Sequence, residues 1–320
     1  MSPALPYLTL SSEEICALHE TGAQTVALQA PEGLKRHLFR VTKQLRAEGF
    51  SVCISGDPCY GACDLCMETK AMADVLLHFG HAPVDDTPGV IYHFAPASPD
   101  PAGVKNALPL LEDTTVGLVT TVQHVHLLEE VKRVLAENGI IGVVCDGSER
   151  TPLHGQVLGC SFEAARKTGA HEILFFGTGV FHPIGISLAT GARVIACDPY
   201  TGRCEIADGD ALLRRRFVQI EKARAAESVG ILLSLKSGQK REELAYELAA
   251  LSENAVVITM QEITPDALLN LGFDAYVNTA CPRLAYDDQV RFPVPVLSPQ
   301  EFEIVCGKRT WDDYAIDEIL

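Results

Sequence analysis

The sequence alternates short apolar runs with helical patterns, and this alternation most constrains what the chain can fold into. Residues 75–77 and 140–145 are examples of continuously apolar runs, whereas apolar residues over 34–45 recur at helical spacing. Continuous apolar strands are typical of a sheet that is buried on both faces, and the helices between them provide the cover. The sequence therefore predicts an α/β fold with parallel sheets.

The alternation occurs three times, at intervals of about one hundred residues, which is an ordinary domain size. We expect three similar Rossmann-like βαβ domains arranged around a central site. Their predicted boundaries are 1–100, 101–206 and 207–320. The Pro-rich segment 95–109 is expected to be a linker. A long helix over about 207–228 should lead into the third domain, with the run Arg214-Arg215-Arg216 on a solvated face.

Composition limits where such a chain can work. The formal net charge of −16 disfavours a nucleic-acid binder, because phosphates require clustered Lys and Arg. No apolar run is long enough to cross a bilayer. Residues 1–6 show neither the basic nor the apolar region of a secretory signal, so we expect a cytoplasmic protein. Thiols stay reduced in that compartment, so the eleven cysteines do not indicate a disulfide framework.

Two arrangements of cysteines could form a three-thiol site. In the local arrangement, Cys59, Cys63 and Cys66 share one Gly/Pro-rich loop with Cys-x3-Cys-x2-Cys spacing. In the distributed arrangement, Cys63, Cys160 and Cys281 each follow a predicted strand, one in each domain. Ligands bind at the carboxyl ends of parallel strands, so three such edges could share one pocket. The residues alone leave both arrangements open, beside the possibility that these are ordinary thiols.

Five motifs, taken together, resemble one known family. They occur in order from residue 31 to residue 287, and any one of them alone would be weak. The motifs are Pro31-Glu32-Gly33-Leu34, Tyr60-Gly61-Ala62-Cys63-Asp64, His78-Phe79-Gly80-His81, Gly155-Gln156-Val157-Leu158-Gly159-Cys160 and Cys281-Pro282-Arg283-Leu284 with Asp287. The chain resembles archaeal-type diphthamide biosynthesis enzymes, which are non-classical radical S-adenosylmethionine proteins.

The resemblance implies the distributed arrangement. It assigns Cys63, Cys160 and Cys281 as ligands of a [4Fe-4S] cluster and offers no role for Cys59 or Cys66. Three protein ligands would leave one iron open to substrate. The implied reaction cleaves S-adenosylmethionine to methylthioadenosine and transfers its 3-amino-3-carboxypropyl group. The implied acceptor is C2 of a histidine in translation elongation factor 2.

Further residues are expected to hold S-adenosylmethionine, whose methionine part carries both charges. Arg283 could bind the carboxylate through paired hydrogen bonds, and Asp287 could accept from the amino group. Gln239 could supply a neutral donor or acceptor. His81, with His78 beside it, could bind the cofactor, bind metal or transfer protons. The resemblance also suggests a homodimer and leaves the electron donor undefined.

Two rival functions follow from the same residues. A quinolinate-synthase-like lyase would share the three-domain fold and the three-cysteine [4Fe-4S] cluster, and the motifs around Cys63 and Cys281 favour the transferase over it. A non-enzymatic metal or redox sensor would instead use Cys59, Cys63 and Cys66.

Overall fold

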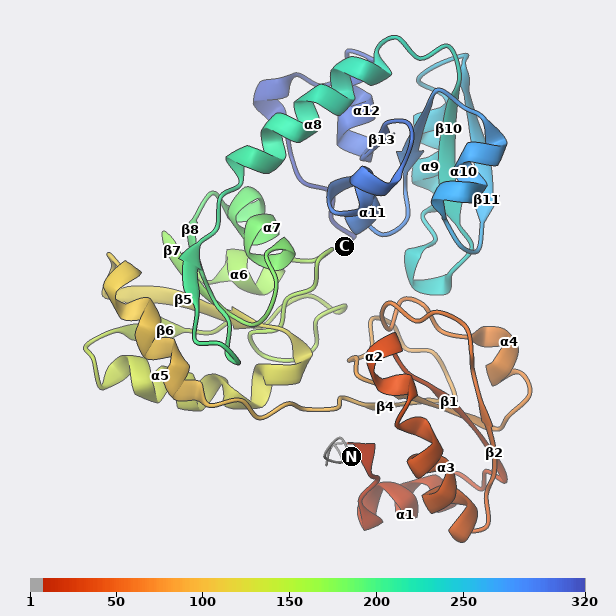
Figure 1. Ribbon diagram of the computed structural model, residues 1–320, viewed down its shortest axis with the longest axis vertical. Coiled ribbons are helices and arrows are strands. Elements are labelled where there is room, and N and C mark those ends of the chain that lie inside the picture. The colour runs from red at the N-terminus through yellow and green to blue at the C-terminus, as the bar shows by residue number, and fades with distance from the viewer. Residues whose placement is uncertain (1–7, 320) are drawn as a thin grey trace.

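The computed structural model describes residues 8–319 and places three β-sheets in three lobes (Figure 1). The N-terminal residues that bear on a secretory signal lie outside this range. The first sheet contains β1 (Thr25–Gln29), β2 (Ser51–Ile54), β3 (Val75–Phe79) and β4 (Val90–His93). The second contains β5 (Thr115–Thr120), β6 (Ile141–Val143), β7 (Glu172–Phe176), β8 (Arg193–Cys197) and β9 (Cys204–Ile206). The third contains β10 (Val229–Ser234), β11 (Ala255–Met260), β12 (Ala275–Asn278) and β13 (Val296–Leu297).

The three sheets share one strand order. The orders are β2-β1-β3-β4, β6-β5-β7-β8-β9 and β11-β10-β12-β13, so the first strand of each unit is always central. All pairs in these sheets are parallel except β8 with β9. The predicted α/β fold with three parallel sheets is therefore confirmed.

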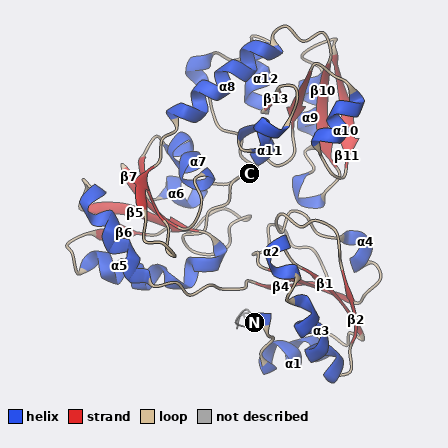
Figure 2. Ribbon diagram, in the orientation of Figure 1, coloured by secondary structure: helices blue, strands red, loops and turns tan. Residues whose placement is uncertain are grey.

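Helices lie between the strands in all three lobes (Figure 2). The α-helices are α1 (Ser12–Glu20), α2 (Glu32–Lys35), α3 (Leu38–Ala47), α4 (Met67–Lys70), α5 (Leu128–Ala136), α6 (Glu163–Lys167), α7 (Phe181–Thr190), α8 (Asp210–Ala223), α9 (Glu242–Ala249), α10 (Pro265–Leu271), α11 (Arg283–Tyr286) and α12 (Pro299–Val305). The 3-10 helices are η2 (Pro101–Leu110), η3 (Val122–Leu127), η4 (Ser237–Gln239), η5 (Asp288–Arg291) and η6 (Trp311–Asp313). Strands β3, β7, β10 and β12 are buried along their whole length, which agrees with their largely apolar sequences.

A carboxylate performs the same structural task in each lobe. Asp74 precedes β3 and accepts hydrogen bonds from the backbone at the start of β1. Glu172 in β7 accepts hydrogen bonds from the backbone N–H groups of residues 112 and 113, just before β5. Asp274 accepts them from residues 227 and 228, just before β10. Each carboxylate ties the entry of a central strand to its neighbour at the edge opposite the strands' carboxyl ends. This shared contact supports the interpretation of the chain as three repeated units.

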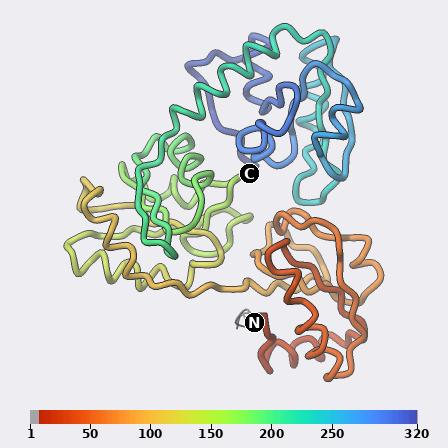
Figure 3. Tube along the Cα trace, viewed as in Figure 1, coloured from red at the N-terminus to blue at the C-terminus, as the bar shows by residue number. Residues whose placement is uncertain are grey.

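The chain passes from the first lobe to the second after β4 and enters the third through α8 (Figure 3). We propose the domain boundaries 1–100, 101–206 and 207–320 at these two passages. Segment 95–109 is not a plain linker, because η2 begins within it, with Asp100 accepting from the Ala102 N–H. The last described residues return to the second lobe, where the Ile319 N–H donates to the Cys160 carbonyl.

Helix α8 corrects one expectation about the arginine run. Arg214 and Arg215 are exposed, but Arg216 is only 1% exposed. Its guanidinium donates to both carboxylate oxygens of Glu301, at 2.8 and 2.6 Å, and to the carbonyls of Ala285 and Val296. The buried face of α8 therefore includes a cation that makes four hydrogen bonds. No helix among residues 8–319 is both long enough and apolar enough to span a membrane.

The buried ion pair leads to a stability prediction. Arg216→Ala should destabilise the third lobe by about 3–5 kcal/mol, because it leaves the Glu301 carboxylate buried without its partner. Urea unfolding followed by the fluorescence of Trp311, the single tryptophan, measures this directly. Arg215→Ala on the same helix is the control and should change stability by less than about 0.5 kcal/mol. Equal effects of the two variants would contradict the assigned role of Arg216.

Candidate functional site

Cys63 is positioned by the carboxyl end of the central strand β1. Gln29, the last residue of β1, donates from Nε2 to the Asp64 carbonyl at 2.7 Å and accepts from the Cys66 N–H through Oε1. The loop is thus fixed directly after its middle cysteine. In the third lobe, Gln239 follows β10 and its Nε2 donates to the Cys63 Sγ at 3.3 Å.

Cys160 reaches the same region by a longer path. It lies well beyond the end of β6, but the segment before it pairs with the end of the central strand β5. The Thr120 N–H donates to the Gly155 carbonyl, and the Val157 N–H donates to the Thr120 carbonyl. This isolated bridge extends the sheet and delivers Cys160 to its carboxyl edge. The loop therefore returns to the sheet before it reaches Cys160.

Cys281 follows β12 directly. The side chain of Asn278, the last residue of β12, donates to the Cys281 carbonyl and accepts from the Ala280 N–H. The Arg241 guanidinium donates to the carbonyls of Thr279 and Ala280 and pairs with both oxygens of Asp317. These contacts hold the turn after β12 rigidly.

The three cysteines line one cavity of about 260 Å³. All three side chains are partly accessible, whereas those of Cys59 and Cys66 are buried. Burial raises the pKa of Cys160 to about 11, with a smaller contribution from the Cys63 charge, and burial raises the pKa of Cys63 and of Cys281 as well. The thiols would therefore stay protonated unless a cation compensates their charge. The structure brings together the members of the distributed arrangement.

The side chains that line this cavity could bind a thiolate-ligated metal centre. It contains three sulfur donors and, among the described residues, no carboxylate. Two guanidinium groups, those of Arg150 and Arg283, also line it. Arg150 Nε is buried without a hydrogen-bond partner in the described structure, so a polar group held in the cavity could satisfy it. Soft thiolates select iron–sulfur clusters or zinc, and nearby cations favour a group of net negative charge.

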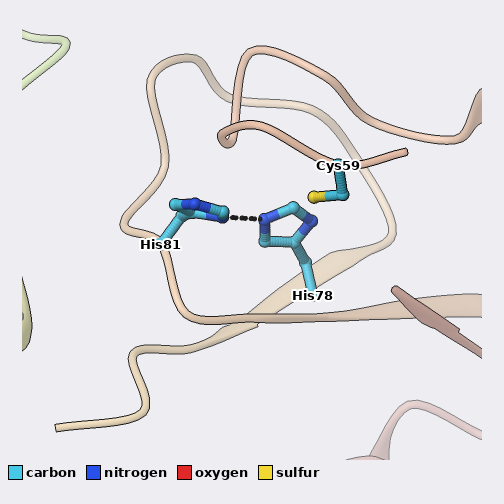
Figure 4. A group of neighbouring side chains, drawn as sticks. All are labelled: Cys59, His78 and His81. Atoms are coloured by element: carbon cyan, nitrogen blue, oxygen red, sulfur yellow. Dashed lines mark hydrogen bonds between the residues drawn. The ribbon is translucent and has the colours of Figure 1, made fainter. Parts of the chain in front are cut away.

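Neither Cys59 nor Cys66 is among the described residues that line this cavity. Cys66 packs against Ala27, Leu65 and Leu76. Cys59 lies instead beside His78 and His81, as Figure 4 shows. Burial raises the pKa of Cys59 to about 12, with the nearby Asp64 charge adding to the shift. The local three-thiol arrangement is therefore not formed in this structure.

The residues expected to hold S-adenosylmethionine divide between two adjacent cavities. His81 lines the cysteine cavity, Gln239 lines a second cavity of about 350 Å³, and Arg283 lines both. Tyr60 and Cys281 are also shared, so the two cavities adjoin at these side chains.

Asp287 lies outside the described lining of both cavities. Its Oδ2 accepts a hydrogen bond from Arg283 Nε at 2.8 Å. The two residues stand four positions apart at helix α11, which brings their side chains together.

Two residues that line the cavities, Arg150 and Lys236, were not predicted from the sequence. Arg150 donates from Nη2 to the Gly238 carbonyl at 2.9 Å and so ties the second lobe to the third. The Lys236 ammonium pairs with Asp64 at 3.0 Å and with Glu262 at 2.7 Å, which ties the third lobe to the cysteine loop of the first. No periodicity marks either residue, because each acts across lobes.

Fold and site together define a class: a three-lobed α/β protein with one thiol from each lobe facing a common cavity. The family model of diphthamide synthesis proteins matches residues 30–316. The chain belongs to this family, as the five sequence motifs indicated.

Curated relatives and a solved structure agree with this assignment. The 2-(3-amino-3-carboxypropyl)histidine synthase of Pyrococcus horikoshii is 36% identical over 97% of this chain and 93% of its own. Subunit 1 of the Homo sapiens synthase is 31% identical over 95% of this chain and 73% of its own. A crystal structure of Dph2 from Pyrococcus horikoshii with a 4Fe-4S cluster matches with a TM-score of 0.91 and 34% identity, covering 98% of this chain and 94% of that one.

The close approach of two lobes gives a testable prediction. A Cβ atom on Gly238 would lie 2.5 Å from the Cα of Cys63, so Gly238→Ala must displace backbone. We expect a loss of about 1–3 kcal/mol by overpacking, measured by urea unfolding, and a weaker hold on Cys63. Gly56→Ala in the cysteine loop is the matched control, because its Cβ would meet nothing within 4 Å. Unchanged stability in Gly238→Ala would contradict the contact.

Proposed function

We propose that this chain is a 2-(3-amino-3-carboxypropyl)histidine synthase that performs the first step of diphthamide biosynthesis. The observation that carries the proposal is the convergence of Cys63, Cys160 and Cys281, one from each lobe, on a single cavity. Three thiolates fit a [4Fe-4S] cluster with one open iron. The 4Fe-4S cluster in the Dph2 structure of Pyrococcus horikoshii supports this assignment.

A bound cluster would supply the electron that cleaves the bond between the sulfur and the γ-carbon of S-adenosylmethionine. The net products would be methylthioadenosine, a 3-amino-3-carboxypropyl group bonded to C2 of the acceptor histidine, and the proton that this C2 loses; the electron is returned when the imidazole ring regains its aromaticity. The chain's own residues hold the cluster, orient S-adenosylmethionine and exclude water. The hydrogen bond from Gln239 Nε2 to the Cys63 Sγ would favour the thiolate form of that ligand.

Arg283 is the residue that we propose to bind the methionine carboxylate. Its Nε is already engaged by Asp287, which leaves the two terminal amino groups of the guanidinium for a paired contact with a carboxylate. Asp287 then acts through Arg283 by fixing the plane of the guanidinium. A direct contact between Asp287 and the methionine amino group finds no support in its position outside the cavities.

His81 could contribute a neutral donor or acceptor at the cysteine cavity. Burial lowers the pKa of His81 to about 4, so its ring carries no charge at neutral pH. Its Nδ1 lies 2.8 Å from His78 Nε2, which leaves Nε2 for a ligand.

The acceptor that we propose is a histidine of translation elongation factor 2, the protein that carries diphthamide. The family assignment favours this transfer over a quinolinate-synthase-like lyase. Neither Cys59 nor Cys66 is among the described residues that line the cavity with Cys63, which disfavours a sensor built on the local loop. We further propose a cytoplasmic homodimer, since all three cysteines belong to one chain and the Pyrococcus horikoshii relative is named as a synthase without a subunit label.

An anaerobic assay with dithionite, S-adenosylmethionine and elongation factor 2 tests the function. We expect methylthioadenosine together with a mass gain of one 3-amino-3-carboxypropyl group on a histidine peptide of the factor, measured by mass spectrometry. Cys281→Ala should abolish both products, whereas Cys66→Ala should retain them. Formation of 5′-deoxyadenosine would contradict the chemistry, and methylthioadenosine without the mass gain would contradict the acceptor.

A further inference from the structure

Three potential metal-binding side chains gather beside the cysteine cavity, in a group that the proposed reaction leaves largely unexplained. Cys59 comes from the loop after β2, His78 from β3 and His81 from the turn after β3 (Figure 4). One ligand atom from each lies within 4.8 Å of the other two. His78 is fully buried and Cys59 is 2% exposed.

The tautomer of His78 is set by Gln29. The Gln29 side chain donates from Nε2 to the Asp64 carbonyl, and its Oε1 accepts from the Cys66 N–H, so the orientation of the amide is fixed. This Oε1 lies 2.9 Å from His78 Nδ1, and an amide oxygen can only accept. In the neutral ring, Nδ1 therefore carries the hydrogen and Nε2 carries the lone pair.

The lone pair of His78 is directed into the group. His78 Nε2 is the atom that lies 2.8 Å from His81 Nδ1. Metal-bound histidines almost always donate their other ring N–H to an oxygen, which fixes the ring and its tautomer. Gln29 Oε1 provides this oxygen for His78. His78 is thus arranged as a metal ligand whose other ring nitrogen is held by Gln29.

We propose that Cys59 Sγ, His78 Nε2 and His81 Nδ1 form a binding site for a divalent zinc-like cation, distinct from the three-cysteine centre. One thiolate and two imidazoles suit Zn²⁺, and three protein ligands leave its fourth position open. Mg²⁺ and Ca²⁺ prefer oxygen ligands, and this group has no carboxylate member.

Binding requires a small rearrangement. Tetrahedral zinc with ordinary bond lengths separates its nitrogen and sulfur ligands by about 3.3–3.5 Å. The 2.8 Å contact between the two histidines must therefore open slightly, and a pair of ligand atoms as far apart as the 4.8 Å limit would have to close by about 1 Å. A cation on Nδ1 would fix the ring of His81 and leave Nε2 as an N–H donor for the cysteine cavity that His81 lines.

The test uses the full-length chain, reconstituted anaerobically with iron and sulfide and then equilibrated with Zn²⁺. We expect one zinc per chain by elemental analysis, and X-ray absorption at the zinc edge should show one sulfur and two nitrogen ligands from the protein. Cys59→Ala should remove the sulfur contribution. Gln29→Leu should weaken zinc binding by about 10–100-fold, as expected for loss of an outer-shell partner.

Controls separate this site from the central one. Cys66→Ala, in the same loop but outside the group, should bind zinc normally. Iron and sulfide contents are measured on the same samples and should be unchanged in Cys59→Ala, which keeps this test independent of the proposed transferase function. Circular dichroism checks folding, and His81→Gln serves as the second ligand variant if Cys59→Ala unfolds. The proposal is overturned by absence of zinc, by zinc bound through several sulfurs, or by binding that survives loss of the ligand side chain.

Discussion

The backbone of Gly238 joins all three lobes at the centre of the molecule. It belongs to the third lobe and lies so close to Cys63 of the first that a side chain could not fit between them. Its carbonyl accepts a hydrogen bond from Arg150 of the second lobe. The neighbouring residues strengthen this junction, because Lys236 pairs with Asp64 and Gln239 donates to the Cys63 Sγ. The spacing of the cysteines therefore depends on contacts between lobes.

A site distributed in this way couples chemistry to the arrangement of whole lobes. Each cysteine is fixed by its own sheet: Cys63 by Gln29 at the end of β1, Cys160 by the bridge beside Thr120, and Cys281 by Asn278. Parallel strands direct all three loops to carboxyl edges, which face one another. A small rotation of one lobe would change the ligand spacing of the whole centre.

Much of the fold could be predicted from the sequence, because buried parallel strands leave a strong apolar signal. The burial of Arg216 could not be predicted, because helical periodicity does not reveal that its guanidinium pairs with Glu301, which lies 85 residues further along the sequence. Arg150 was missed for a related reason: it lies in an irregular loop whose path is set by pairing with β5. The motif around Asp287 placed it near the site, but helix α11 turns it toward Arg283. The sequence pattern of a strand or helix predicts that element, but it does not predict which side chains of distant elements will be in contact.

Replacing single cysteines identifies the residues that hold the proposed cluster. Single Ala variants of the cysteines are reconstituted anaerobically with iron and sulfide, and bound clusters are quantified by absorbance and by electron paramagnetic resonance after reduction. We expect Cys63→Ala, Cys160→Ala and Cys281→Ala each to lose the [4Fe-4S] signal, and Cys59→Ala and Cys66→Ala to retain it. A different result would contradict the distributed arrangement. If Cys160→Ala and Cys281→Ala retained the signal while Cys59→Ala or Cys66→Ala lost it, the cluster would be held by one loop.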